Sequence, residues 1–218
     1  MVNEEGRVTI NSKETVEALK FSRALYETFI PGTNSWLDPS NNKALLAGEI
    51  GATQNGVSLY FSAKNSKDPE IAKMAADLNH ARMPIGPVGR STEAALAINA
   101  MAFKHTKAPN AAKAYLAFMM EAPQYDHWLT DSFGYWSQPL RAYAASDVWT
   151  NDPKIAVFKD TMERSLWLAY PGPITEASGA VAADYVMVDM VAAAATGTST
   201  PEDAAKEADR RARRYYRS

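Results

Sequence analysis

Cysteine is absent from the 218-residue chain, and its absence excludes several kinds of site. Without a thiol there is no disulfide framework, thiolate zinc site, iron–sulfur cluster or cysteine nucleophile. Histidine is scarce as well. His80, His105 and His127 stand far apart, without the short spacing of a histidine metal site. The sequence therefore predicts surface or capping histidines and a protein that binds no metal.

The phosphate-binding and hydrolase motifs are missing too. Residues 86–89 contain too few glycines for a dinucleotide loop, and Pro87 lacks the N–H that would face a phosphate. Residues 177–179 (Ala-Ser-Gly) lack the leading glycine of a nucleophile elbow. No cofactor is expected.

An excess of charge of either sign is also missing. The chain has 23 basic and 25 acidic residues, which gives a net charge of −2 and no reason to expect a nucleic-acid partner. The N-terminus lacks the basic start and apolar run of a signal peptide, so no export signal is expected in this chain. The most apolar stretch, residues 177–195, carries Asp184 and Asp189 and makes a poor membrane span. A soluble protein is predicted.

Apolar residues at helical spacing are abundant in the sequence. Prolines at positions 109, 153 and 201 stand where the first turn of a helix tolerates them. The patterns predict an α/β chain with many helices and few strands. We expect helices over 11–30, 43–47, 109–120, 124–129, 153–168, 177–195 and from 200 onward, a loose helix or loop over 68–79, a loop over 134–139, and strands over 49–54 and 94–103.

Two pairs of carboxylates are candidates for acid–base chemistry. Asp147 and Asp152 form the first pair, and Glu202 and Asp203 form the second. A glycosidase needs two acids that face one bond across a cleft, which closeness in sequence does not establish. The second pair lies where a helix N-terminus attracts acids. A glycoside-processing hydrolase domain that uses the first pair stays an alternative function.

A basic run, residues 210–217, contains five arginines and two tyrosines. Arginine beside aromatic rings can bind nucleic acid, so a helical interaction module is a second alternative. The dipole at a helix C-terminus also favours cations, which makes a helix end the preferred interpretation. Four acids precede the run on the same expected helix: Glu202, Asp203, Glu207 and Asp209.

Aromatic residues are the remaining lead, with five Trp and ten Tyr. Rings beside amides and hydroxyls suit the apolar faces and hydroxyl groups of a neutral sugar or polyol. The opposing interpretation is that many of them are core residues near turns. The aromatics in loop-like contexts are Trp36, Tyr60, Tyr135, Trp136 and Tyr170.

The order of segments resembles the extracellular solute-binding proteins of family 1, the sugar-type substrate-binding proteins of ABC importers. The resemblance covers nearly the whole chain, although no single motif is specific. It rests on residues 14–26, 42–52, Asn55-Gly56, 84–89, 108–119, the 134 loop, the 171–173 break and the helix that begins near 200.

The resemblance implies a type II periplasmic-binding-protein-like α/β fold, in which two lobes close over a ligand. Residues 1–85 would belong to the second lobe, 86–131 would return to the first, and 132–218 would complete the second. The chain is expected to be a C-terminal portion, and the complete protein to be periplasmic or extracellular. Residues 94–103 and the helix 109–120 would then lack their first-lobe partners, so we expect a homodimer of this chain.

The resemblance also implies a non-enzymatic role. The ligand would be a sugar or polyol, the protein partners would be ABC permease subunits, and neither a cofactor nor a metal would take part. Maltose-binding members carry an aromatic residue where this chain has Ser58. The residues expected to face the ligand are Trp36, Asn55, Gly56, Ser58, Tyr135, Trp136, Glu176 and Ser178.

Overall fold

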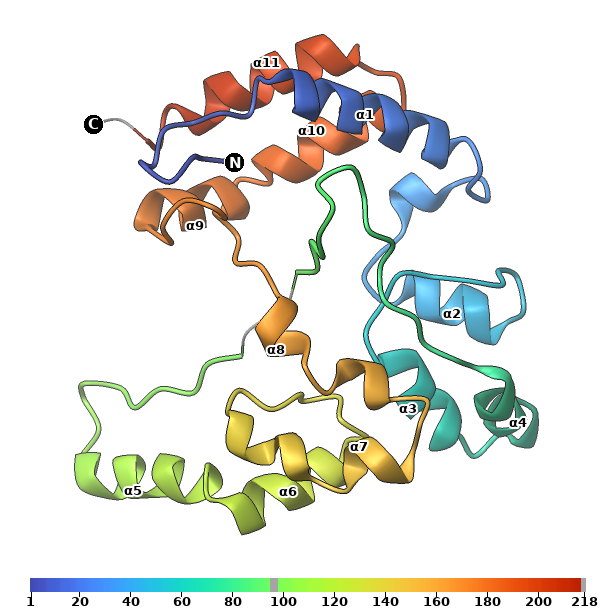
Figure 1. Cartoon of the computed structure of the whole chain (residues 1–218), viewed down its shortest axis with the longest axis vertical. Coiled ribbons are helices and arrows are strands. Elements are labelled where there is room, and N and C mark those ends of the chain that lie inside the picture. Colours follow the sequence, from blue (N-terminus) through green and yellow to red (C-terminus); the bar gives the residue numbers. More distant parts are fainter. Residues whose placement is uncertain (95–97, 217–218) are drawn as a thin grey trace. The chain divides into compact units, whose positions relative to one another are not determined.

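The computed structural model describes residues 1–94 and 98–216, and these divide into two compact units. Unit 1 combines Met1–Ser40 with Leu166–Ser218, and unit 2 is Asn41–Ser165. Figure 1 labels the helices. The α-helices are α1 (Lys13–Tyr26), α2 (Ser40–Leu46), α3 (Ser58–Lys64), α4 (Pro69–Asp77), α5 (Pro109–Met119), α6 (Ala122–Asp131), α7 (Val148–Asn151), α8 (Thr161–Arg164), α9 (Glu176–Ala183), α10 (Val186–Ala195) and α11 (Pro201–Ala212), and the 3-10 turns are η1 (Thr33–Ser35), η2 (Arg141–Ala145) and η3 (Ala156–Phe158).

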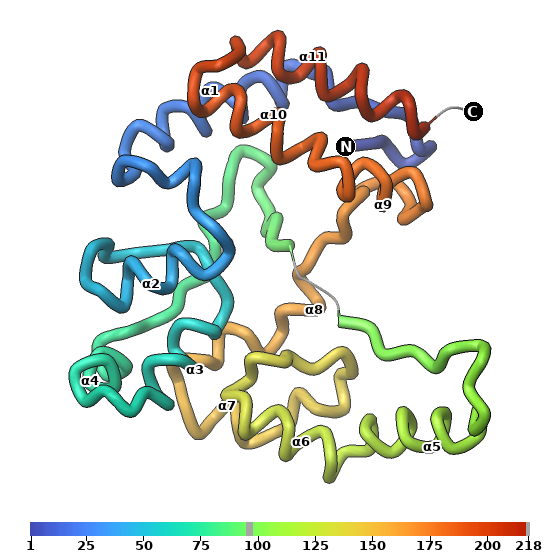
Figure 2. Tube along the Cα trace, turned by 180° about the vertical axis from the view of Figure 1, so that it is seen from behind, coloured from blue at the N-terminus to red at the C-terminus, as the bar shows by residue number. Residues whose placement is uncertain are grey.

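Unit 1 is built on α1, α10 and α11, which lie side by side (Figures 1 and 2). The expected alanine face of α11 is confirmed, because Ala204, Ala208 and Ala212 are all buried. Small side chains let the helices approach closely. The buried cluster of this unit consists of Val2, Val8, Ile10, Leu19, Ala169, Val181, Val186, Met190, Ala194, Ala204, Ala205, Ala208 and Ala212.

Both ends of α11 follow local rules. The Thr200 side chain accepts a hydrogen bond from the Asp203 N–H at 3.1 Å, and Pro201 opens the helix. At the other end Arg210 and Arg211 stand in the last turn, as the dipole predicts. Arg211 donates to Asp189 Oδ2 at 2.7 Å, so the basic run contributes to holding α11 against α10.

Unit 2 has its own buried cluster, centred on α6. The stacked rings of Tyr125 and Tyr143 have their centroids 4.5 Å apart. Pro123 lies in the first turn of α6, which begins at Ala122, and α5 ends at Met119, so the expected interruption is confirmed. The buried residues of the cluster are Val57, Tyr60, Tyr125, Leu129, Tyr143, Val148, Trp149 and Ile155.

The expected strands are not seen. Residues 49–54 form no strand, because none of their backbone groups joins a ladder. Residues 98–103 carry no regular structure, and 95–97 of the same expected strand lie outside the described residues. No sheet is found in 1–94 or 98–216, although Val2 and Val8 form an isolated antiparallel bridge. The α/β class is therefore not confirmed, while the helix-rich character is.

Two expected helices are wrong in their extent. The helix expected over 153–168 is replaced by a turn at 153–155, η3 and α8. The Asp152 side chain accepts from the Lys154 N–H within that turn. The long helix expected to reach residue 195 is two helices, α9 and α10. They meet at Tyr185, whose φ of 52° and ψ of 24° are left-handed.

The expected first helix is also shorter than its pattern. It begins after Ser12, whose side chain accepts from the Thr15 N–H, and ends at Tyr26 rather than at residue 30. Residues 27–29 turn back through hydrogen bonds to the carbonyls of the last helical turn. Apolar periodicity thus runs past the true end of the helix.

No single helix of the described residues is long and apolar enough to cross a membrane, and α9 and α10 pass that test only as a pair bent by 41°. The buried residues of this pair include Val181, Val186, Met190 and Ala194, and all four belong to the core cluster of unit 1.

The lobe boundaries expected from the resemblance, 1–85, 86–131 and 132–218, divide the chain differently from the two compact units. They remain a prediction about the complete protein.

Candidate functional site

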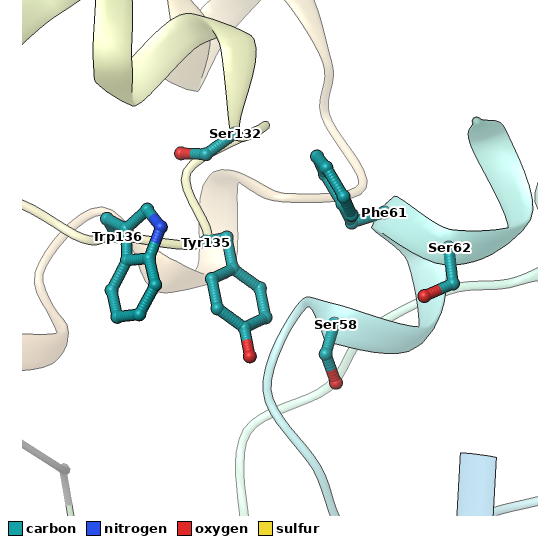
Figure 3. Close-up of a pocket in the computed structure, with 6 residues that line it drawn as sticks. All are labelled: Ser58, Phe61, Ser62, Ser132, Tyr135 and Trp136. Carbon is teal, nitrogen blue, oxygen red and sulfur yellow. The ribbon is translucent and has the colours of Figure 1, made fainter. Parts of the chain in front are cut away.

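A pocket of 330 Å³ lies within unit 2, between the N-terminal turns of α3 and the loop that follows α6 (Figure 3). Figure 3 shows the side chains that these two segments contribute to its lining. The lining residues are Ser58, Phe61, Ser62, Ser132, Tyr135 and Trp136. All six are neutral.

A tight turn after α6 places the two aromatic residues of this pocket. Gly134 has a φ of 71°, and its N–H donates to the Leu129 carbonyl at 2.8 Å. A Cβ at this position would stand 2.7 Å from the Trp149 ring, so only glycine fits. The turn places Tyr135 and Trp136, the two residues that follow it, in the lining of the pocket.

Hydrogen bonds then fix the loop. The Tyr125 hydroxyl lies 3.2 Å from the Trp136 carbonyl and 3.3 Å from the Ser137 carbonyl, within donating distance of both. The side chains of Ser137 and Gln138 donate to backbone carbonyls near η3. Because its backbone is held at several points, the loop presents a prearranged aromatic surface.

The aromatic wall of the pocket is continuous. The rings of Tyr135 and Trp136 meet edge to face at 5.0 Å, and the Phe61 ring lies 6.2 Å from that of Tyr135. Beyond the pocket, the Trp128 ring lies 6.0 Å from that of Trp136. Tyr135 is 42% exposed, so its ring is open to a solute.

The polar side of the pocket comes from the start of α3. The Ser58 hydroxyl donates to Asn55 Oδ1 at 3.3 Å, and the Gly56 N–H donates to the same oxygen at 2.8 Å. In Figure 3 the hydroxyl groups of Ser58 and Tyr135 point to the same side. The pocket thus combines ring faces with hydroxyls, the pattern of a site for a neutral, hydroxylated solute.

Five of the eight predicted residues therefore belong to this region. Ser58, Tyr135 and Trp136 line the pocket, and Asn55 and Gly56 form the turn at its edge. Their role in binding remains a prediction.

The sequence reasoning missed Phe61, Ser62 and Ser132. Phe61 and Ser62 lie three and four positions after Ser58, so helical spacing could have found them once α3 was known to be a helix. Ser132 is the residue that ends α6, and no sequence signal marked it.

The other three predicted residues lie in unit 1. Trp36 follows η1 and is half-buried, and Glu176 is exposed at the start of α9. Ser178 is fully buried and completes a capping box with Thr175. Its hydroxyl is committed to the helix start, so we do not propose it as a ligand contact.

A charged cluster joins two residues of α3, Tyr60 and Lys64, to Asp152. The Asp152 carboxylate accepts from Lys64 Nζ at 2.8 Å and from the Tyr60 hydroxyl at 2.6 Å. Burial raises the pKa of Asp152, but these hydrogen bonds and that from the Lys154 N–H outweigh it and lower the pKa overall. Burial and the Asp152 contact raise the pKa of Tyr60. An acid held in this way stays ionised and serves as a structural anion.

A metal site is equally unsupported by the side-chain arrangement. Over residues 1–94 and 98–216, no group of three His, Asp or Glu side chains could hold a metal ion. His80 instead packs edge-on against Phe158, and its Nδ1 lies 2.8 Å from the Lys154 carbonyl.

Comparison with known families adds an independent finding. The family model of the bacterial extracellular solute-binding proteins matches residues 2–157, which is well over half of the chain. A search among curated proteins finds no match. The match spans the pocket's α3 and its aromatic loop. This chain belongs to the family of bacterial extracellular solute-binding proteins.

Proposed function

We propose that the protein is the substrate-binding component of an ABC importer and that it binds a neutral sugar or polyol through the unit 2 pocket. Family membership gives the substrate-binding role in transport. The observation that carries the finer proposal is the pocket itself, which combines aromatic rings and serine hydroxyls without a charged lining residue.

The chemistry of binding follows from that lining. The ring faces of Tyr135 and Trp136 offer apolar contact to the C–H faces of a sugar ring, and Ser58 offers a hydrogen bond. A charged solute would find no opposite charge there and would lose hydration. No bond is made or broken, so the protein acts by binding and releasing the solute.

In the proposed cycle, two lobes of the complete protein close over the solute, and the permease recognises the closed form. Trp36 and Glu176, which lie in unit 1, remain predictions that rest on the resemblance in segment order alone. The complete protein would act at the extracellular or periplasmic side of the membrane, in line with the family's description.

The test is calorimetric titration of the chain with a panel of neutral solutes: glucose, galactose, maltose, trehalose, sucrose and sorbitol. Galacturonate and lysine serve as charged controls. We expect saturable heat with at least one neutral solute and none with the controls. Binding of only a charged solute, or of no solute, would overturn the proposal.

Neither alternative function gains support from the described residues. The hydrolase alternative needs Asp152 beside a reacting bond, but its carboxylate is occupied by Lys64 and Tyr60. The interaction module would use the basic run, and three arginines of that run, Arg210, Arg211 and Arg213, are already ion-paired within this chain.

A further inference from the structure

A closed ring of hydrogen bonds stands at the polar edge of the pocket. Asn42 Nδ2 donates to Ser58 Oγ at 3.3 Å, and the Ser58 hydroxyl donates to Asn55 Oδ1 at 3.3 Å. Asn55 Nδ2 completes the ring by donating to Asn42 Oδ1 at 2.6 Å. Each side chain donates to the next, an arrangement in which each bond polarises its neighbour.

The ring determines what Ser58 can offer to a solute. A serine hydroxyl has one donor hydrogen and two acceptor lone pairs. The hydrogen goes to Asn55 and one lone pair receives the Asn42 amide, so the remaining capacity is one lone pair. The two Asn amides each keep a second N–H beyond the ring.

We propose that Asn42 is a positioning residue that holds Ser58 as an acceptor and so selects solutes that present a hydroxyl group to this edge. A solute hydroxyl can donate to Ser58 and accept from an amide N–H at once. A carboxylate can only accept, and an ammonium group can only donate. The inference rests on the proposed function and names the group that the site would select.

Asn41 provides a matched control, because it is the neighbouring amide on α2. Its Nδ2 donates to Thr53 Oγ1 at 3.2 Å, and its Oδ1 accepts from the Asn42 backbone N–H at 2.8 Å. Among the described residues its side chain makes no hydrogen bond to the side chains of the ring. Replacing either residue by alanine removes the same atoms from the same helix. The two variants differ in whether the Ser58 ring is broken.

The experiment is a double-mutant cycle of Asn42→Ala and Ser58→Ala, titrated with the neutral solutes of the panel above. We expect Asn42→Ala to weaken binding about fivefold to tenfold, which is the cost of one lost hydrogen bond. In the Ser58→Ala background the same change should cost nothing further, because Asn42 acts through Ser58. Asn41→Ala should bind as the wild type does.

Equal affinities of the wild type and Asn42→Ala, or equal losses in both backgrounds, would overturn the inference while leaving the proposed function intact. A wild type that binds no solute of the panel would overturn the proposed function, and this inference with it. Asn42→Asp gives a second variant if Asn42→Ala unfolds. Its carboxylate still accepts from Asn55 but cannot donate to Ser58, so the same loss is expected.

Discussion

The Tyr60 hydroxyl donates a hydrogen bond of 2.6 Å to the Asp152 carboxylate, which lies 92 positions further along the chain. Lys64, one turn after Tyr60 on α3, donates to the same oxygen at 2.8 Å. The Lys64 ammonium also stands 4.6 Å from the centre of the Phe133 ring, next to the pocket loop. The Asp152 carboxylate, just after α7, therefore holds α3, the helix that carries Ser58, through two hydrogen bonds.

The first prediction concerns how the stabilisation by these Asp152 contacts depends on pH. The pKa of the Asp152 carboxyl is lower in the folded protein than in the unfolded chain. The ionised carboxylate therefore stabilises the fold fully at a pH above its unfolded-state pKa. This stabilisation is lost as the pH falls through its folded-state pKa. Asp152→Asn should lower the free energy of unfolding at pH 7 by about 1–3 kcal/mol. The difference from the wild type should shrink below about pH 4, as measured by urea unfolding across that range.

Asp147→Asn is the control for that experiment. Asp147 is exposed beside the same short helix, and its carboxylate takes no part in the contact with Lys64 and Tyr60. If both variants lose equal stability, or if the Asp152 difference does not shrink as the pH falls, the assigned role of the ion pair is wrong.

The second prediction uses two glycines with the same backbone conformation. Gly134 and Gly89 have φ values of 71° and 73°, but only at Gly134 would a Cβ collide with a neighbour, the Trp149 ring. Both alanine variants carry the cost of a left-handed residue, about 1–2 kcal/mol. Gly134→Ala should lose about 1–3 kcal/mol more through overpacking, measured by thermal or urea unfolding. Equal losses would mean that the loop does not pack on Trp149.

The third prediction addresses the aromatic wall. Trp136→Ala should weaken binding of the best neutral solute of the panel by about 1–3 kcal/mol, because a ring contact is lost. Tyr115→Ala is the control, since Tyr115 is exposed on α5 and does not line the pocket. The measurement is calorimetric titration. Undiminished affinity of Trp136→Ala would remove this residue from the proposed site.

The fourth prediction is that metal removal has no effect. Cysteine is absent, and the described side chains contain no metal-ligating cluster. Dialysis against EDTA should leave both the melting temperature and solute binding unchanged. A fall in either that zinc or calcium restores would contradict the prediction.

The fifth prediction is self-association of this chain. Helix α5 buries none of its residues, and Tyr115 and Phe118 are 62% and 45% exposed. Uncovered apolar surface of this kind favours pairing with another chain. Light scattering should report a dimer, and Tyr115→Lys combined with Phe118→Lys should shift it toward the monomer. A wild-type monomer at all concentrations would overturn the prediction.

Local features of the fold could be predicted because local rules decide them. The start of α11 follows from Thr200, Pro201 and two acids in the first turn, and its alanine face follows from a spacing of four. The stop at Gly48, which has a φ of 73°, and the break between α5 and α6 follow from Gly and Pro in the same way.

Part of the candidate site could be predicted for a similar reason. Tyr135 and Trp136 stand in a loop whose composition sets it apart, and the order of segments is enough to indicate a solute-binding family. Ser132 could not be found in this way, since it becomes part of the pocket only through the packing of α3 against the turn after α6. Ser62 follows from helical spacing after Ser58, but only once α3 is known to be a helix.

The amino-acid sequence by itself excludes thiol chemistry, marks helix ends at Pro and Gly, and indicates the family. The remaining features depend on tertiary packing. Residues 49–54 form no strand because a strand needs a partner that no local pattern can supply. Asp152 is a structural anion, and Asn42 supports Ser58, because Lys64, Tyr60 and Asn55 lie beside them in space. Contacts between distant residues depend on how the whole chain packs, and local sequence does not encode them.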